Sequence, residues 1–176
     1  MIKTLLFIML LSTLFVNLQA YNQKDLEKLL SYQYCPGGDL SKASLSKANL
    51  AGADLSEVNL AGAELSEANL QNSFLTGANL QNANLSKANL SGSQLSNAKL
   101  IGANLSGSDL SNADFSESDL TNANLKGAKD SEVKFTDTLF SNTIMPDGSK
   151  FSGYMGRTQL RQNDMDLNQT TGIGSE

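Results

Sequence analysis

The sequence predicts an all-β solenoid, a square coil of about twenty residues per turn with a short α-helix capping its N-terminal end. Three observations predict this fold. Leucine recurs at every fifth residue, the residue two places before it is small, and the residue two places after it is commonly glycine or asparagine.

The leucine repeat runs without an insertion through eighteen consecutive positions, one of them a phenylalanine, and a further phenylalanine keeps the phase at position 135. Burying one leucine is worth about 1.5–3 kcal/mol relative to exposing it. These side chains are therefore expected to form the structural core: Leu40, Leu45, Leu50, Leu55, Leu60, Leu65, Leu70, Leu75, Leu80, Leu85, Leu90, Leu95, Leu100, Leu105, Leu110, Phe115, Leu120, Leu125 and Phe135.

A period of five fits neither an α-helix nor a flat strand. A helix rotates about 500° in five residues, which would spread the leucines around its surface. A strand has a period of two, which would put successive leucines on opposite faces. A chain that turns a corner every five residues keeps every leucine inside, and four corners close one coil.

The other repeat positions agree with such a coil. Small residues such as Ala63 and Ala83 precede each leucine by two places, where a narrow tube has little room; Val58 is the largest of them. Residues such as Gly52 and Asn72 follow by two places and suit corners, since glycine and asparagine tolerate a positive φ. Neighbouring coils would stack at the parallel-strand spacing of about 4.8 Å.

The first twenty residues have the layout of a secretory signal peptide. Lys3 supplies a positive charge, residues 5–16 are an apolar run, and a polar step ends at Ala20. This pattern predicts cleavage between Ala20 and Tyr21. The alternative is an uncleaved N-terminal anchor, although the apolar run is short for a membrane-spanning helix.

The mature chain divides into three parts. Residues 21–37 are expected to form a capping helix and a turn, with Asn22 as the N-cap. Residues 38–145 are expected to form the solenoid, and residues 146–176 a polar, flexible C-terminal tail.

Composition argues against most enzyme classes. The chain has a formal charge of −5, no histidine and one cysteine, so the commonest general base and metal ligand are missing. Carboxylate groups such as Asp54 with Glu57, or Asp114 with Glu117, fall at outward positions on a convex tube. We therefore expect no catalytic residue, no cofactor and no metal site.

Triplets such as Ala48-Asn49-Leu50, Ala78-Asn79-Leu80 and Ala103-Asn104-Leu105 follow the pattern A-[ND]-L-x-x. With this pattern the chain resembles the pentapeptide-repeat proteins over roughly residues 38–145, and residues 143–148 look like the end of secreted, cyanobacterial-type members. The resemblance implies a right-handed quadrilateral β-helix.

Members of that family often carry C-x-x-C at the N-terminal cap, and here the second place is Gly38. Cys35 is interpreted as a small buried residue under the cap helix. The alternative is an intermolecular disulfide in an oxidising compartment.

A twenty-residue coil places residues twenty apart on one face. It predicts that Phe115 and Phe135 are neighbours inside the tube, and that Lys47 and Glu67 are neighbours outside it. Phe74 falls at an outward position usually held by asparagine or aspartate, and Ile101 also points outward. Either could contact a partner, although isolated exposed apolar residues are common.

The leading functional hypothesis is a non-enzymatic structural or protein-interaction module outside the cytoplasm: in the periplasm, the thylakoid lumen or the extracellular space. Its partner would be another protein rather than a nucleic acid or, after signal cleavage, a membrane, and it would be a monomer or an end-to-end dimer.

Two alternatives stay open. Some relatives of this type mimic DNA and bind type II topoisomerases, but Lys42, Lys47, Lys87 and Lys99 interrupt the acidic surface. A column of serines could instead bind a repeating surface such as ice or a cell-wall polymer.

Overall fold

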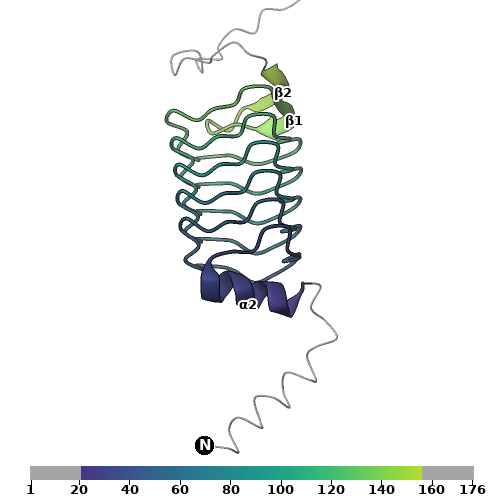
Figure 1. The fold of residues 1–176 in the computed structure, drawn as a ribbon. Coiled ribbons are helices and arrows are strands. Elements are labelled where there is room, and N and C mark those ends of the chain that lie inside the picture. Colours follow the sequence, from purple (N-terminus) through teal and green to yellow (C-terminus); the bar gives the residue numbers. More distant parts are fainter. Residues whose placement is uncertain (1–20, 156–176) are drawn as a thin grey trace, which may run out of the picture.

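A computed structural model describes residues 21–155 of the chain as a straight tube with a helix at one end and a β-hairpin at the other (Figure 1). The predicted signal peptide, with its cleavage site after Ala20, lies outside the described residues. Within the described part no helix is both long enough and apolar enough to cross a membrane.

The tube is a right-handed quadrilateral β-helix with the twenty-residue coil expected from the sequence. Parallel bridges join residues twenty apart, from Tyr34 with Asp54 to Asn124 with Ile144. Each rung makes two backbone hydrogen bonds of the same kind throughout. For example, the Leu50 N–H donates to the Asn69 carbonyl at 2.7 Å, and the Asn69 N–H donates to the Ala48 carbonyl at 2.9 Å.

The core is a continuous column of inward side chains. All eighteen residues of the leucine repeat are buried, none with more than 3% of its surface exposed. Most of the small residues beside them are buried as well, Ala63 and Val58 completely, while Ala48 is partly buried. Because the interior is filled, only the outward side chains can contact other molecules.

Each corner is a turn in which the N–H of the small residue donates back to the carbonyl of the leucine three places earlier, as from Ala53 to Leu50 at 3.1 Å. The residue before the small one has a positive φ, as in a type II turn. Glycine and asparagine occupy many of these places as expected. Lysine and glutamate occupy others, such as Lys47 and Glu67, with φ near 60°.

The N-terminal end is covered by helix α2, Gln23–Tyr32. Its N-cap is Asn22, whose side chain accepts a hydrogen bond from the Lys24 N–H at 3.0 Å. Leu29 is completely buried against the first coil. The helix therefore shields the apolar core where the first coil has no neighbour.

The C-terminal end differs from the sequence-based expectation. We expected a flexible tail over residues 146–176, but strand β2, Lys150–Met155, pairs antiparallel with strand β1, Thr138–Ile144. The reason is that the last coil would otherwise present unpaired strand edges. Phe151 adds an aromatic contact, since its ring centroid lies 5.7 Å from that of Phe140. Residues 156–176 of the expected tail lie outside the described residues.

Phe115 and Phe135 are neighbours inside the tube, as predicted, with ring centroids 5.6 Å apart. Phe140 continues the stack at 5.4 Å from Phe135 in an edge-to-face arrangement. Aromatic pairs of this kind add stability beyond simple burial. In the last coils, phenylalanine rings thus take inward positions that leucines occupy in the earlier coils.

Candidate interaction surface

The outward residue before each inward leucine forms one column on each of the four faces. The residues of one column lie twenty apart in sequence and are joined by parallel bridges. Two of these columns differ in the chemistry of their side chains. The amide column holds residues 49, 69, 89, 109 and 129, and the aromatic column holds residues 34, 54, 74, 94, 114 and 134.

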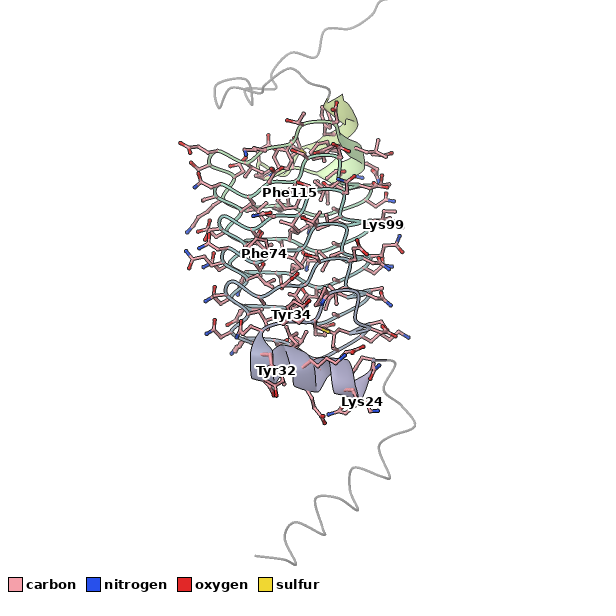
Figure 2. The ribbon with its side chains drawn as sticks, in the orientation of Figure 1. Lys24, Tyr32, Tyr34, Phe74, Lys99 and Phe115 are labelled. Carbon is pink, nitrogen blue, oxygen red and sulfur yellow. The ribbon has the colours of Figure 1, made fainter. Side chains whose placement is uncertain are left out.

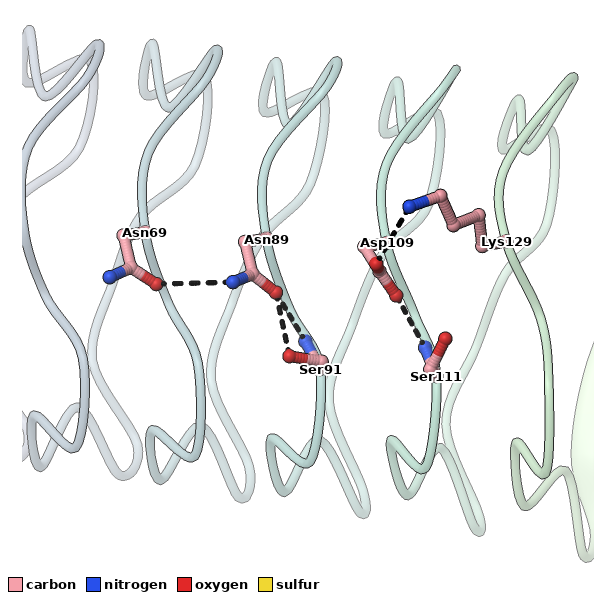
Figure 3. A network of polar contacts seen from close by, with 6 residues as sticks. All are labelled: Asn69, Asn89, Ser91, Asp109, Ser111 and Lys129. Carbon is pink, nitrogen blue, oxygen red and sulfur yellow. Dashed lines mark hydrogen bonds and ion pairs between the residues drawn. The ribbon is translucent and has the colours of Figure 1, made fainter.

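The amide column is a ladder of side-chain hydrogen bonds. The Asn69 Nδ2 donates to Asn49 Oδ1 at 3.1 Å, and the Asn89 Nδ2 donates to Asn69 Oδ1 at 3.4 Å (Figure 3). Each Oδ1 also accepts a backbone N–H two residues on, such as that of Ser91 at 3.1 Å. Amide side chains in this column are thus engaged with one another rather than free to bind a ligand.

The ladder changes where Asp109 replaces asparagine. Asp109 has no amide to donate, and Asn89 Oδ1 accepts instead from the Ser91 hydroxyl at 2.7 Å. Asp109 in turn pairs with Lys129 at 3.2 Å (Figure 3). Hydrogen bonding from the Ser111 side chain, its backbone N–H and Lys129 lowers the pKa of Asp109, although partial burial opposes this.

Charge is not spread evenly along the tube. Residues 68–108 contain no aspartate or glutamate, and they include Lys87 and Lys99. The carboxylates of the solenoid are therefore confined to its first coils and its last coils.

The aromatic column carries two exposed rings, and a third, that of Tyr32, lies on α2 with 77% of its surface exposed. Tyr34 is 57% exposed and Phe74 is 42% exposed, with Asp54 between them. Figure 2 shows Tyr32, Tyr34 and Phe74 following one another along the length of the tube. Leu139, 38% exposed, lies in a different column, two coils after Lys99.

Phe74 is exposed, as the sequence indicated, whereas Ile101 is only half-buried. Sequence reasoning missed Tyr34 as a member of the same column. The twenty-residue register could have found it, since Tyr34, Asp54 and Phe74 are spaced by twenty, but Tyr34 precedes the first leucine of the repeat.

Cys35 is buried beneath α2 with 3% of its surface exposed and forms no disulfide. Burial, helped by the nearby Asp25 carboxylate, raises the pKa of its thiol. A thiol in this position reacts poorly, because the thiolate is the reactive form and access is closed.

The structure places Asp54 and Glu57, the carboxylates paired in the sequence, in different surroundings. Asp54 is half-buried and accepts hydrogen bonds from Ser56, while Glu57 is exposed at a corner. No group of three or more metal-ligating side chains occurs within residues 21–155.

Comparison with known proteins gives consistent findings. The family model for pentapeptide repeats matches residues 30–62, 39–72, 63–100 and 98–129, with eight copies. Among curated protein sequences, none matches this chain.

Solved structures of pentapeptide-repeat proteins are also similar. Rfr23 from the cyanobacterium Cyanothece 51142 is 26% identical, with a TM-score of 0.68 over 69% of this chain and 97% of that one. HetL from the cyanobacterium Nostoc, which is involved in regulating heterocyst differentiation, is 34% identical, with a TM-score of 0.37 over 67% and 64% of the two chains. A thylakoid-lumen protein of Arabidopsis thaliana is 26% identical, with a TM-score of 0.42 over 67% and 76%.

Proposed function

Because this chain belongs to the pentapeptide-repeat family, we propose that it is a non-enzymatic protein-interaction module that works outside the cytoplasm. Its place outside the cytoplasm rests on the signal-peptide pattern of residues 1–20. The binding role rests on the architecture, since a filled, rigid tube offers regular outer faces for another macromolecule.

One observation carries the proposal: the exposed rings of Tyr34 and Phe74 stand on one face of the tube. Most other positions of the four outward columns hold asparagine, aspartate or lysine. Many of these side chains form hydrogen bonds or ion pairs within the protein. Tyrosine and phenylalanine are enriched at the centres of protein–protein interfaces. The aromatic column is therefore the working surface that we assign to the module.

The distribution of charge disfavours DNA mimicry. A DNA duplex carries about one negative charge per 1.7 Å of its axis. Here the middle of the tube, residues 68–108, has no carboxylate and two lysines. A protein that competes for a DNA-binding groove would need acidic groups along its whole length.

The serine column gives little support to binding of ice or a cell-wall polymer. The Ser46 and Ser66 hydroxyls bond to each other at 3.0 Å, so part of their capacity is used within the protein. Lys47 and Glu67, which pair at 3.7 Å, stand beside them and interrupt any regular array of hydroxyls.

The test begins with fractionation of the native cell and mass spectrometry of the N-terminus. We expect a mature start at Tyr21 in an extracytoplasmic fraction. Chemical cross-linking in that fraction should then capture a partner protein with the wild-type chain but not with Phe74→Asn. Leu139→Asn is the matched control, since Leu139 is similarly exposed on another face, and it should retain the partner.

Two results would oppose the proposal. A start at Met1 in the cytosol would remove the assigned location. A partner captured equally by the wild-type chain and Phe74→Asn would place the working surface elsewhere.

A further inference from the structure

The aromatic column contains an aspartate between two exposed rings. Parallel bridges join Tyr34 to Asp54 and Asp54 to Phe74, so the three residues lie on three successive coils. At the parallel-strand spacing, the backbones of Tyr34 and Phe74 are about 10 Å apart. A group over Asp54, on the middle coil, would have Tyr34 and Phe74 on the coils at either side, each one strand spacing of about 5 Å away, which is compatible with a cation–π interaction.

Asp54 lacks the lysine partner that two later aspartates of the solenoid, Asp109 and Asp114, have. Asp109 pairs with Lys129 at 3.2 Å, and Asp114 approaches Lys134 at 3.7 Å. In both cases the lysine lies one coil further toward the C-terminus. For Asp54 that place is taken by Phe74, and no ion pair to Asp54 is found within residues 21–155.

One oxygen of Asp54 is already used, because Oδ1 accepts the Ser56 N–H at 3.1 Å and the Ser56 hydroxyl at 2.7 Å. These bonds fix the orientation of the carboxylate. Its other oxygen makes no hydrogen bond within the described residues, and Asp54 is only half-buried. The carboxylate is therefore held in place while it can still accept a donor from outside.

The chemistry of the pair of rings selects the kind of cation. A metal ion would need several oxygen ligands, and the rings provide none. An arginine guanidinium is planar and weakly hydrated, stacks on aromatic faces and donates to a carboxylate at the same time. Exposed Glu57, at the next corner of the same coil, adds a second negative charge to this end of the tube.

We propose that Tyr34, Asp54 and Phe74 form a docking site for an arginine side chain of the partner protein. This inference rests on the proposed function and adds the chemistry by which the partner is recognised. In it the two rings flank the guanidinium, and Asp54 neutralises its charge.

The experiment uses the protein as recovered from its native fraction, labelled with nitrogen-15. Backbone amide signals are followed in NMR while a short glycine-flanked arginine peptide is added. The same peptide with citrulline, which has nearly the same shape but no charge, is the ligand control. A lysine peptide tests whether the flat guanidinium matters beyond its charge.

We expect shifts confined to residues near 34, 54 and 74, with weak, millimolar-range affinity for a single side chain. The citrulline peptide should bind at least tenfold more weakly, and the lysine peptide more weakly than arginine. Asp54→Asn and Phe74→Asn should each weaken arginine binding at least tenfold. Asp119→Asn and Leu139→Asn, which alter an aspartate and an apolar residue also one coil apart, should leave binding unchanged.

Equal binding of the arginine and citrulline peptides, or no effect of Asp54→Asn, would overturn the inference. So would shifts spread over several faces, which would indicate non-specific attraction to an acidic chain. If cross-linking depends on Phe74 but the arginine peptide does not bind, the interaction module stands and the arginine site fails. If the peptide binds but no protein is captured, the site stands and the proposed function fails.

Discussion

Lys129 places its ammonium nitrogen 3.2 Å from the carboxylate of Asp109, one coil nearer the N-terminus. The pair occupies the same column in which Asn49, Asn69 and Asn89 bond amide to carbonyl. In every rung of this kind a donor in one coil meets an acceptor in the coil before it. The hydrogen bonds of a column thus all run in one direction along the tube. Whether a side chain fits a position in the column therefore depends on the residue twenty places away.

The directed ladder predicts different costs for the same substitution at two positions. In Asn69→Asp, the carboxylate would lose the hydrogen bond to Asn49 Oδ1 and would face that oxygen. We expect a loss of about 1–2 kcal/mol in the free energy of unfolding, measured by urea denaturation.

Asn49→Asp is the matched control. Asn49 begins the ladder and accepts from Asn69 through Oδ1, which an aspartate can do equally well. We expect a change within about 0.5 kcal/mol. Equal costs at the two positions would mean that the amide ladder adds little to stability.

The inward serines predict a stabilising substitution. Ser93 donates its hydroxyl to the Leu90 carbonyl at 2.6 Å, but the corresponding acceptor of Ser118, the Phe115 carbonyl, already accepts from Thr138 at 2.7 Å. Among residues 21–155, the buried Ser118 hydroxyl has no hydrogen-bond partner. Ser118→Ala should raise the free energy of unfolding by about 1 kcal/mol, since alanine is the usual residue in this position.

Ser93→Ala serves as the comparison and should lower the free energy of unfolding by about 1 kcal/mol, because it removes a made hydrogen bond. Both changes in the free energy of unfolding can be measured by thermal or urea denaturation. A loss of stability in Ser118→Ala would show that the hydroxyl finds a water or another partner.

The core of this protein could be predicted from the sequence because a single five-residue period determines which side chains point inward. A leucine every five residues fixes the length of the coil, and the coil length places Phe115 beside Phe135. The same arithmetic places Lys47 beside Glu67, which pair at 3.7 Å. No long-range information was needed, since each contact is a fixed twenty places away.

Features outside the repeat were harder to predict. Strand β2 lies beyond the last repeat, where composition is polar and no period continues, so its pairing with β1 depends on the free edge that only the folded coil creates. The positive φ of charged corner residues, such as Glu67, could not be predicted from residue preference alone. There the turn dictates a positive φ whatever the side chain, and a corner side chain such as that of Glu67 is exposed.

The candidate site was only half visible in the sequence. Phe74 stood out because it replaces the usual asparagine or aspartate of its repeat. Tyr34 did not stand out, because it lies before the leucines begin. The lack of a lysine beside Asp54 could be recognised only once the partners of Asp109 and Asp114 were known.

The N-terminal cap predicts a dependence of stability on acid. The Asp25 carboxylate accepts the Asp39 N–H at 3.1 Å and pairs with Lys28 at 3.1 Å, and these interactions lower its pKa. Because the folded pKa lies below the unfolded value of about 3.9, the charged form stabilises the fold above about pH 4. That contribution is lost as the pH falls through the folded pKa.

Asp25→Asn should therefore lower the midpoint of urea unfolding at pH 7, and the difference from the wild-type protein should vanish once the pH falls below the folded pKa of Asp25. Glu27→Gln, an exposed change on the same helix, is the control and should show no such convergence. A difference that persists at low pH would mean that the carboxylate acts through shape rather than charge.

The absence of a side chain at Gly38 predicts a coupling with Cys35. A Cβ added at Gly38 would overlap the Cys35 sulfur and would lie 3.3 Å from Asp25 Cβ. Gly38 does not have a positive φ, so backbone strain does not require glycine here. Gly38→Ala should lower the free energy of unfolding by about 1–3 kcal/mol through crowding under α2.

The double variant with Cys35→Ala separates the two neighbours. Removing the sulfur opens the space that the new methyl group needs, so the cost of Gly38→Ala should fall by at least about 1 kcal/mol in the Cys35→Ala background. Cys35→Ala alone should cost about 1 kcal/mol for the lost buried sulfur. If Gly38→Ala costs the same in both backgrounds, the limit is set by Asp25 and the end of the helix rather than by the sulfur.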